Sequence, residues 1–268
     1  MIKLIVSDID GTLLDDNKKL HDDFWEVFEE LQKRGIYFVP ASGRQYFNIY
    51  EYFKRIKKGL VIIAENGSYI VEDGKEIYSK CLDKKDAVEL IEAARRISTA
   101  DVIFCGKKKA YIENDNPKFI EEVEKYYTRY EIVEDITKVD DEALKITLCD
   151  LTGAEENSFP HVKKYSEKYK VAVSGFIWID ITQKDINKGV GLRILQEKLG
   201  ITKDETMVFG DYLNDYELML EGAYSFAMEN AHPDLKKIAK YNGGDNNDSG
   251  VVKSIKRYIY LSNDKKNL

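Results

Sequence analysis

Four aspartates in two short segments have the spacing of a metal-binding site. Asp8 and Asp10 directly follow one short apolar run, and Asp211 and Asp215 follow another. Such runs predict buried strands of a parallel sheet, and ligands bind where parallel strands end. Carboxylates gathered there repel one another unless a cation compensates, and hard oxygen ligands favour Mg²⁺. The four aspartates therefore predict a magnesium site, although each one alone could be a turn residue or a helix N-cap.

Residues suited to binding a phosphate group lie in two further segments. Ser42 and Gly43 follow a third apolar run, and Lys188 opens a predicted helix. A hydroxyl and a free backbone N–H at the start of a helix can cradle an anion. A lysine at that position has the wrong sign for the helix dipole, and a bound phosphate would supply its negative partner. The alternatives are that Ser42 is only a helix N-cap and that Lys188 is a solvated side chain.

Strands and helices alternate around these segments, which predicts an α/β core with a parallel, doubly wound sheet. The predicted strands are residues 4–6, 36–39, 60–64, 207–209 and 224–227. Pro40 is expected to end the second of them. Helical faces are expected at residues 24–31, 46–53, 190–199 and 251–259, and the polar tail 263–267 is expected to fray.

The regular alternation of strands and helices is lost in the middle of the chain, which predicts an inserted domain of α+β type. Asp73-Gly74 lies between two strand-like runs and indicates a hairpin. We expect a Rossmann-like core of residues 1–82 and 183–268 and an inserted domain of residues 83–182. Within the insert, strands are predicted at residues 102–105, 144–148 and 176–181, and helical faces at residues 87–97 and 119–130.

Composition limits the classes of partner. The chain has 268 residues and a net charge of -7, from 41 basic and 48 acidic residues. An acidic chain binds nucleic acid poorly without specificity, so no nucleic-acid partner is expected. Cys81, Cys105 and Cys149 are widely spaced, which argues against a disulfide framework and fits a reducing compartment. No apolar stretch approaches the roughly 20 residues of a membrane span, so we expect a cytoplasmic protein without a membrane partner.

Taken in order, these segments resemble the motifs of the haloacid dehalogenase superfamily. They look like its Cof-type branch, whose members carry a large α/β cap between the second and third motifs. Tyr212 departs from the pattern, because a small or polar residue is more usual there. The segments that resemble the first to fourth motifs are residues 8–14, 41–44, 188–189 and 210–215, with further matches at residues 64–67 and 247–251.

The resemblance implies a division of labour between the first two aspartates. Asp8 would be the nucleophile, and its attack on phosphorus would split a difficult hydrolysis into two easier steps. Asp10 would protonate the leaving oxygen and then activate water against the phosphoaspartate. The implied phosphate-binding residues are Ser42, Gly43, Lys188 and Asn214. The implied Mg²⁺-binding residues are Asp8, Asp10 through its backbone carbonyl, Asp211 and, in support of the metal shell, Asp215.

The predicted function is the hydrolysis of small phosphate monoesters by a Mg²⁺-dependent phosphatase. The resemblance alone points to sugar phosphates or related small phosphorylated metabolites as substrates. One alternative is a phosphomutase, which would pass the phosphoryl group back to a sugar. Another is a non-catalytic regulator that binds phosphosugars, but it would need to lack the nucleophile or the acid, and Asp8 and Asp10 are both present.

The inserted domain is expected to select the substrate. Two chain crossings, near Leu82 and Thr182, could act as a hinge and let the domain close over the phosphoaspartate. Phe176 and Trp178 are candidates for recognising the substrate, with the alternative that they are packing positions in a strand. The sequence does not indicate an oligomeric state.

Overall fold

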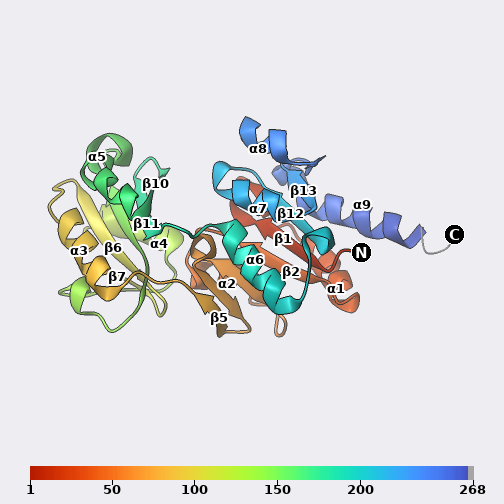
Figure 1. The fold of residues 1–268 in the computed structure, drawn as a ribbon, viewed down its shortest axis with the longest axis horizontal. Helices are drawn as coiled ribbons and strands as arrows, with labels where there is room; N and C mark the ends of the chain where they lie inside the picture. Colours follow the sequence, from red (N-terminus) through yellow and green to blue (C-terminus); the bar gives the residue numbers. More distant parts are fainter. Residues whose placement is uncertain (265–268) are drawn as a thin grey trace. The chain divides into compact units, whose positions relative to one another are not determined.

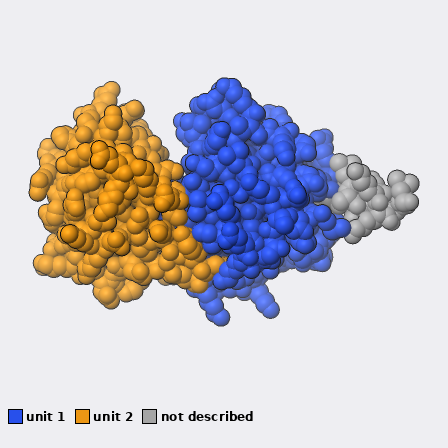
Figure 2. Space-filling view, in the orientation of Figure 1, with its two compact units in different colours: residues 1–43, 52–75, 187–268 blue, residues 44–51, 76–186 orange. Residues whose placement is uncertain are grey.

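The computed structural model describes residues 1–264, with side chains to Tyr258, and the chain forms two compact units (Figures 1 and 2). Unit 1 comprises residues 1–43, 52–75 and 187 onward, and unit 2 comprises residues 44–51 and 76–186. The domain borders predicted at residues 83 and 182 stay a prediction. The predicted polar tail falls largely outside the described residues. Among the described helices, none has the length and apolar character needed to span a membrane.

Unit 1 contains seven strands of an eight-stranded sheet with strand order β14-β13-β12-β1-β2-β3-β4-β5, and β5 belongs to unit 2 except for its first residue. The pairs from β14 to β3 are parallel, and β4 runs antiparallel to β3. The order reverses between β1 and β12, and ligands bind at the carboxyl ends of strands at such a reversal. The strands are β1 (Leu4–Asp8), β2 (Tyr37–Ala41), β3 (Val61–Ala64), β4 (Tyr69–Glu72), β5 (Lys75–Ser79), β12 (Thr206–Gly210), β13 (Tyr224–Ala227) and β14 (Tyr241–Asn242).

The helices of this α/β layer bury apolar faces at helical spacing. In α1 the buried residues are Phe24, Val27, Phe28 and Leu31. Helix α6 ends where Gly200 adopts a left-handed conformation, with φ of 64°. Helix α1 packs against α9, and α6 packs against α7. The helices are α1 (Phe24–Lys33), α6 (Lys188–Leu199), α7 (Tyr216–Leu220), α8 (Pro233–Ile238) and α9 (Gly250–Asp264). Helix α2 (Tyr46–Phe53) is divided between the units, with its residues 46–51 in unit 2.

The predicted parallel α/β core is confirmed, with differences at two of its strands. β2 continues past Pro40 to Ala41, because proline keeps its carbonyl acceptor and its missing N–H removes only one ladder bond. β14 was not predicted, because two residues carry no readable pattern. In unit 2, β11 begins at Trp178, because the two residues before it form the turn from β10. The hairpin predicted at Asp73-Gly74 is present between β4 and β5.

Unit 2 contains a six-stranded sheet with strand order β10-β11-β9-β6-β7-β8, antiparallel except for the β7–β8 pair. Alternate residues of β6 enter different apolar clusters, as the period of a strand requires. Val102 and Phe104 pack with α3, whereas Ile103 and Cys105 pack with α4. The elements are α3 (Lys84–Ala94), β6 (Ala100–Gly106), β7 (Ala110–Ile112), α4 (Pro117–Tyr126), β8 (Tyr130–Ile132), β9 (Ala143–Asp150), α5 (Phe159–Val162), β10 (Tyr169–Gly175) and β11 (Trp178–Gln183).

Residues 44–51 belong to unit 2 through contacts with the segment that follows α4. The side-chain amide of Gln45 donates to the carbonyl of Arg129 at 2.9 Å and accepts from the backbone N–H of Arg129 at 3.1 Å. The guanidinium of Arg129 lies 3.8 Å from the ring centroid of Phe47. Of the two aromatic residues proposed to recognise the substrate, Phe176 is exposed. Trp178 is buried in the apolar cluster that β6 forms with α4.

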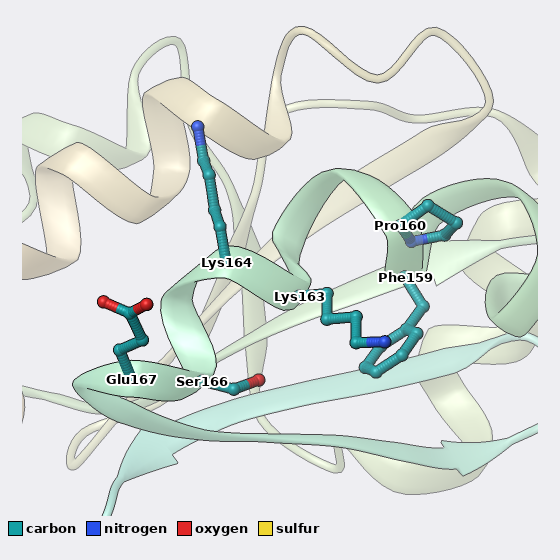
Figure 3. A pocket seen from close by; sticks show the side chains of 6 residues that line it. All are labelled: Phe159, Pro160, Lys163, Lys164, Ser166 and Glu167. Carbon is teal, nitrogen blue, oxygen red and sulfur yellow. The ribbon is translucent and has the colours of Figure 1, made fainter.

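A shallow pocket on unit 2 has a volume of about 570 Å³ (Figure 3). It contains none of the predicted site residues, and its two lysines lie at an open surface. Its lining residues are Phe159, Pro160, Lys163, Lys164, Ser166 and Glu167.

Candidate active site

The carboxyl ends of three strands bring the predicted segments to one edge of the sheet in unit 1. Asp8 is the last residue of β1 and lies beside Ala41 in β2, one residue before Ser42. On its other side β1 pairs with β12, which ends directly before Asp211. The parallel register therefore places Asp8, the loop of Ser42 and Gly43 and the second acidic segment at the same edge.

Lys188 lies buried between two carboxylates at this edge. Its side chain has 0% exposed surface, and its ammonium group donates hydrogen bonds to Asp8 and to Asp215, the latter at 2.7 Å. Helix α6 starts at Lys188, and the Asn187 side chain caps it by accepting from the N–H of Val190 at 2.8 Å. The alternative of a solvated lysine is wrong, because the helix start directs this side chain into the acidic site.

Three of the four predicted carboxylates gather around this lysine. Oxygen atoms of Asp8, Asp211 and Asp215 all lie within 4.8 Å of one another. Burial raises the pKa of Asp8 well above its ordinary value, and the charges of Asp215 and Asp211 raise it further against the opposing charge of Lys188. Burial, followed by the charge of Asp215, raises the pKa of Asp211 to about 6. Asp8 and Asp211 are thus costly to ionise in this site without more positive charge.

The charge of Lys188 is held in place by its acidic neighbours. Burial alone would lower the pKa of Lys188, but the nearby charges of Asp215 and Asp8 outweigh burial and raise the pKa above its ordinary value. A lysine that stays protonated in a buried site supplies a fixed positive charge. That charge suits an anion such as a phosphoryl group.

Asp10 differs from Asp8 in its surroundings. Both residues lie at the turn η1 (Ile9–Leu13), which Gly11 permits by adopting a φ of 73°. The side chain of Asp10 is 33% exposed, and its Oδ1 lies 2.9 Å from the Nζ of Lys18. Two carboxylates two residues apart therefore have different environments, one buried in the cluster and one at its rim, which suits them to different roles.

Ser42 and Gly43 directly follow β2 at the edge of the sheet where Asp8 lies, and Asn214 directly precedes Asp215; their phosphate-binding role stays a prediction. Ser42 is buried, and its backbone N–H donates to the carbonyl of Ile63 at 2.9 Å. Helix α2 begins only at Tyr46, so the alternative that Ser42 is merely the N-cap is wrong. Asn214 is exposed in the short turn η7 (Leu213–Asp215).

Asp215 has a structural task as well as its contact with Lys188. Its Oδ2 accepts from the backbone N–H groups of Asp211 at 3.1 Å and Tyr212 at 3.4 Å. These bonds cap the turn η7 and hold Asp211 at the end of β12. Asp215 can therefore cap the turn and also take its predicted part in the metal site, because the other oxygen of the same carboxylate accepts from Lys188.

The residues present fit a divalent cation. Three clustered carboxylates face one ammonium group, so the ionised cluster has an excess of negative charge. All three side chains offer oxygen ligands, the kind that Mg²⁺ prefers. Asp8, Asp211 and Asp215 can contribute side chains, whereas the carboxylate of Asp10 pairs with Lys18.

Sequence reasoning missed three residues that contact the site. The hydroxyl of Thr12 donates to Asp211 at 3.1 Å, and the amide of Asn230 donates to the Gly11 carbonyl at 2.8 Å. Thr12 lies within the first motif, and Asn230 follows β13. Both could have been found from the tendency of ligands to bind at the carboxyl ends of parallel strands. The contact of Lys18 with the acid/base candidate had no sequence signal, because it depends on the geometry of a surface turn.

Comparison with known proteins places this site in a family. Residues 5–255 match the model of the haloacid dehalogenase-like hydrolases. The chain is 34% identical to the 5-amino-6-(5-phospho-D-ribitylamino)uracil phosphatase YbjI of Escherichia coli, over 96% of each chain. It is 27% identical to the phosphatase YcsE of Bacillus subtilis, named for the same substrate, also over 96% of each.

A solved structure is similar to this chain in fold. The protein SMU.1108c of Streptococcus mutans is 29% identical, with a TM-score of 0.86 over 97% of this chain and 100% of that one. The family predicted from the motifs is confirmed: this chain belongs to the haloacid dehalogenase-like hydrolases and is a phosphatase.

Proposed function

We propose that this phosphatase hydrolyses small phosphate monoesters in a Mg²⁺-dependent reaction, through a phosphoaspartate on Asp8. The observation that carries the proposal is the buried contact of Lys188 with Asp8, beside Asp211 and Asp215. A nucleophilic carboxylate, a fixed cation and two further oxygen ligands are the groups that phosphoryl transfer requires.

The reaction would proceed in two balanced steps. A carboxylate oxygen of Asp8 attacks phosphorus, the bond from phosphorus to the leaving oxygen breaks, and Asp10 gives its proton to that oxygen. The alcohol then leaves. A water molecule attacks the phosphorus of the phosphoaspartate, Asp10 takes the proton of that water, and inorganic phosphate leaves with Asp8 regenerated.

Several groups would hold the phosphoryl oxygens during both steps. Lys188 supplies a fixed positive charge, and the Ser42 hydroxyl with the Gly43 N–H supplies neutral donors. Asn214 would help to orient the phosphate. When bound by Asp8, Asp211 and Asp215 and by the Asp10 carbonyl, Mg²⁺ supplies the charge that keeps the carboxylates ionised and neutralises the phosphoryl oxygens.

The names of two relatives and the division of the chain into two units support a substrate class. Two relatives are named for 5-amino-6-(5-phospho-D-ribitylamino)uracil, whose phosphate ends a polyol chain. We propose a phosphorylated sugar or polyol of this size as the substrate. Residues 83–182 would form the cap that selects it.

A phosphate-release assay over a panel of phosphorylated metabolites tests the function. Chelation should abolish release, Mg²⁺ should restore it, and a folded Asp8→Asn variant should be inactive. Transfer of the phosphoryl group to a second sugar, instead of its release, would favour the phosphomutase. Binding of phosphosugars without any turnover would favour the regulator.

A further inference from the structure

An unusual turn lies between the proposed phosphate-binding loop and the helix that carries Lys188. The turn η2 (Glu65–Gly67) follows β3, and its three residues all have positive φ, at 50°, 55° and 98°. Two of them, Glu65 and Asn66, are not glycine, and this left-handed conformation is unfavourable for a residue with a Cβ atom. Backbone strain of this kind persists where the surrounding structure imposes it, and it is often found at functional sites.

The turn holds the phosphate-binding loop through Asn66. The backbone N–H of Asn66 donates to the carbonyl of Ser42 at 2.9 Å, and the N–H of Ser42 donates to the carbonyl of Ile63 at the same distance. Both backbone groups of Ser42 are thus bonded to the segment that contains the turn. The side-chain oxygen of Asn66 is buried and accepts no hydrogen bond from the residues that the structure describes.

The side-chain amide of Asn66 also packs against Gly43. Gly43 does not have a positive φ, so its backbone conformation is open to other residues. A Cβ atom on Gly43 would lie 2.8 Å from Nδ2 and 3.0 Å from Oδ1 of Asn66. The amide therefore lies directly against the Cα of Gly43, and a side chain at position 43 would have to displace it.

The other end of the turn contacts the start of α6. A Cβ atom on Gly67 would overlap the carbonyl oxygen of Asn187, and a Cβ on Gly191 would lie 3.0 Å from the Cα of Gly67. Asn187 is the N-cap of α6 and directly precedes Lys188. The same three residues thus contact both the loop of Ser42 and the helix that presents Lys188.

We propose that Asn66 is a positioning residue for phosphoryl transfer, whose amide fixes the loop of Ser42 and Gly43 relative to Lys188. The inference rests on the proposed function, because it assumes that these three residues bind the phosphoryl group. Asn66 needs no contact with the substrate in this role. It sets the separation between the neutral donors of the loop and the ammonium group.

Asn66→Gly is the variant that isolates the amide. Glycine accepts the left-handed conformation, so the turn can form while the contact with Gly43 is lost. Asp73→Gly is the matched control. Asp73 has a φ of 49° and its carboxylate accepts from two backbone N–H groups at 2.9 Å, so its loss also removes a polar side chain from a left-handed turn. Because Glu72 pairs with Val61 at the start of β3, this control lies at the opposite end of that strand from Ala64.

The readouts are inhibition by orthovanadate, which mimics the transferred phosphoryl group, and the Mg²⁺ concentration for half-maximal activity. Asn66→Gly should raise the inhibition constant of vanadate by about tenfold to a hundredfold, since small misplacements of such groups are costly. Its Mg²⁺ midpoint should stay within about twofold, because the aspartates are not moved. Asp73→Gly should lower the urea midpoint and change neither kinetic constant.

A double variant tests the contact itself. Gly43→Ala should weaken vanadate inhibition in the wild-type background, because its Cβ meets the Asn66 amide. In the Asn66→Gly background the same change should add little, and fully additive losses would overturn the proposed contact. Unchanged vanadate inhibition in Asn66→Gly, or an equal loss in Asp73→Gly, would overturn the role of Asn66 alone. A wild-type enzyme that vanadate does not inhibit would overturn the proposed phosphoryl site as well.

Discussion

Asp211→Asn should stabilise the metal-free protein while removing its response to Mg²⁺. Burial and the charge of Asp215 raise the pKa of Asp211 from 3.8 to about 6. The folded protein therefore holds this proton more tightly than the unfolded chain does. The stability that the proton contributes is full below the unfolded value, near pH 4, and is lost as the pH rises through the folded value, near pH 6.

The size of the effect follows from the shift. About two pH units correspond to about 3 kcal/mol of unfolding free energy, at about 1.4 kcal/mol per unit. Asparagine cannot ionise, so it avoids this loss at neutral pH. It keeps an oxygen that can accept from Thr12 but alters the surrounding bonds, so we expect a net gain of about 1–3 kcal/mol.

Urea unfolding in chelator, at neutral pH and near pH 4, measures this difference. The gain of Asp211→Asn should be present at neutral pH and should shrink near pH 4, where wild-type Asp211 is protonated too. Asp22→Asn, at an exposed aspartate, should change stability by no more than about 0.5 kcal/mol. Added Mg²⁺ should stabilise wild type and the Asp22 control but not the Asp211 variant. A destabilised Asp211→Asn protein with no pH dependence would refute the electrostatic reasoning.

Three other predictions follow from the same contacts. Lys188→Met should lower the free energy of unfolding by about 3–5 kcal/mol at neutral pH, because it leaves Asp8 and Asp215 buried without their cation. Urea unfolding would measure this loss, and a loss below about 1 kcal/mol would contradict a buried ion pair. Asp10→Asn should slow hydrolysis of an alkyl phosphate far more than that of para-nitrophenyl phosphate, because the nitrophenolate group leaves without needing a proton. Equal losses in kcat on the two substrates would argue against Asp10 as the general acid. Ca²⁺ should support turnover poorly in place of Mg²⁺, because it prefers more ligands at longer distances, and equal rates with the two ions in a phosphate-release assay would exclude a Mg²⁺-type site.

The sequence predicted the elements of the core because their patterns are local. The apolar runs within β1, β3 and β12 are continuous, as expected of parallel strands buried on both faces. The stop of α6 at Gly200 was readable for the same reason. β14 and the passage of β2 through Pro40 were not, because each depends on pairing with a neighbouring strand.

The sequence predicts those parts of the candidate site that lie at the carboxyl ends of parallel strands, because these ends meet at one edge of the sheet. The convergence of strand ends and the motif resemblance predict from the sequence that Asp8, Ser42 and Asp211 lie together. They could not show that Lys18 pairs with Asp10 or that Asn66 lies against Gly43, because both contacts join separate turns. The assignment of residues 44–51 to unit 2 was equally hidden, since it rests on contacts with residues near 129.

Chemical trapping of the phosphoenzyme tests the central claim most directly. The protein would be quenched in acid during turnover with Mg²⁺, and the quenched protein would be reduced with borohydride, which converts an acyl phosphate of aspartate to homoserine. Peptide mass spectrometry would then locate the modified residue. We predict homoserine at position 8, in greater yield in Asp10→Asn, where hydrolysis of the intermediate is slowed. Turnover without any homoserine, or with homoserine at Asp211 or Asp215, would contradict a phosphoaspartate on Asp8.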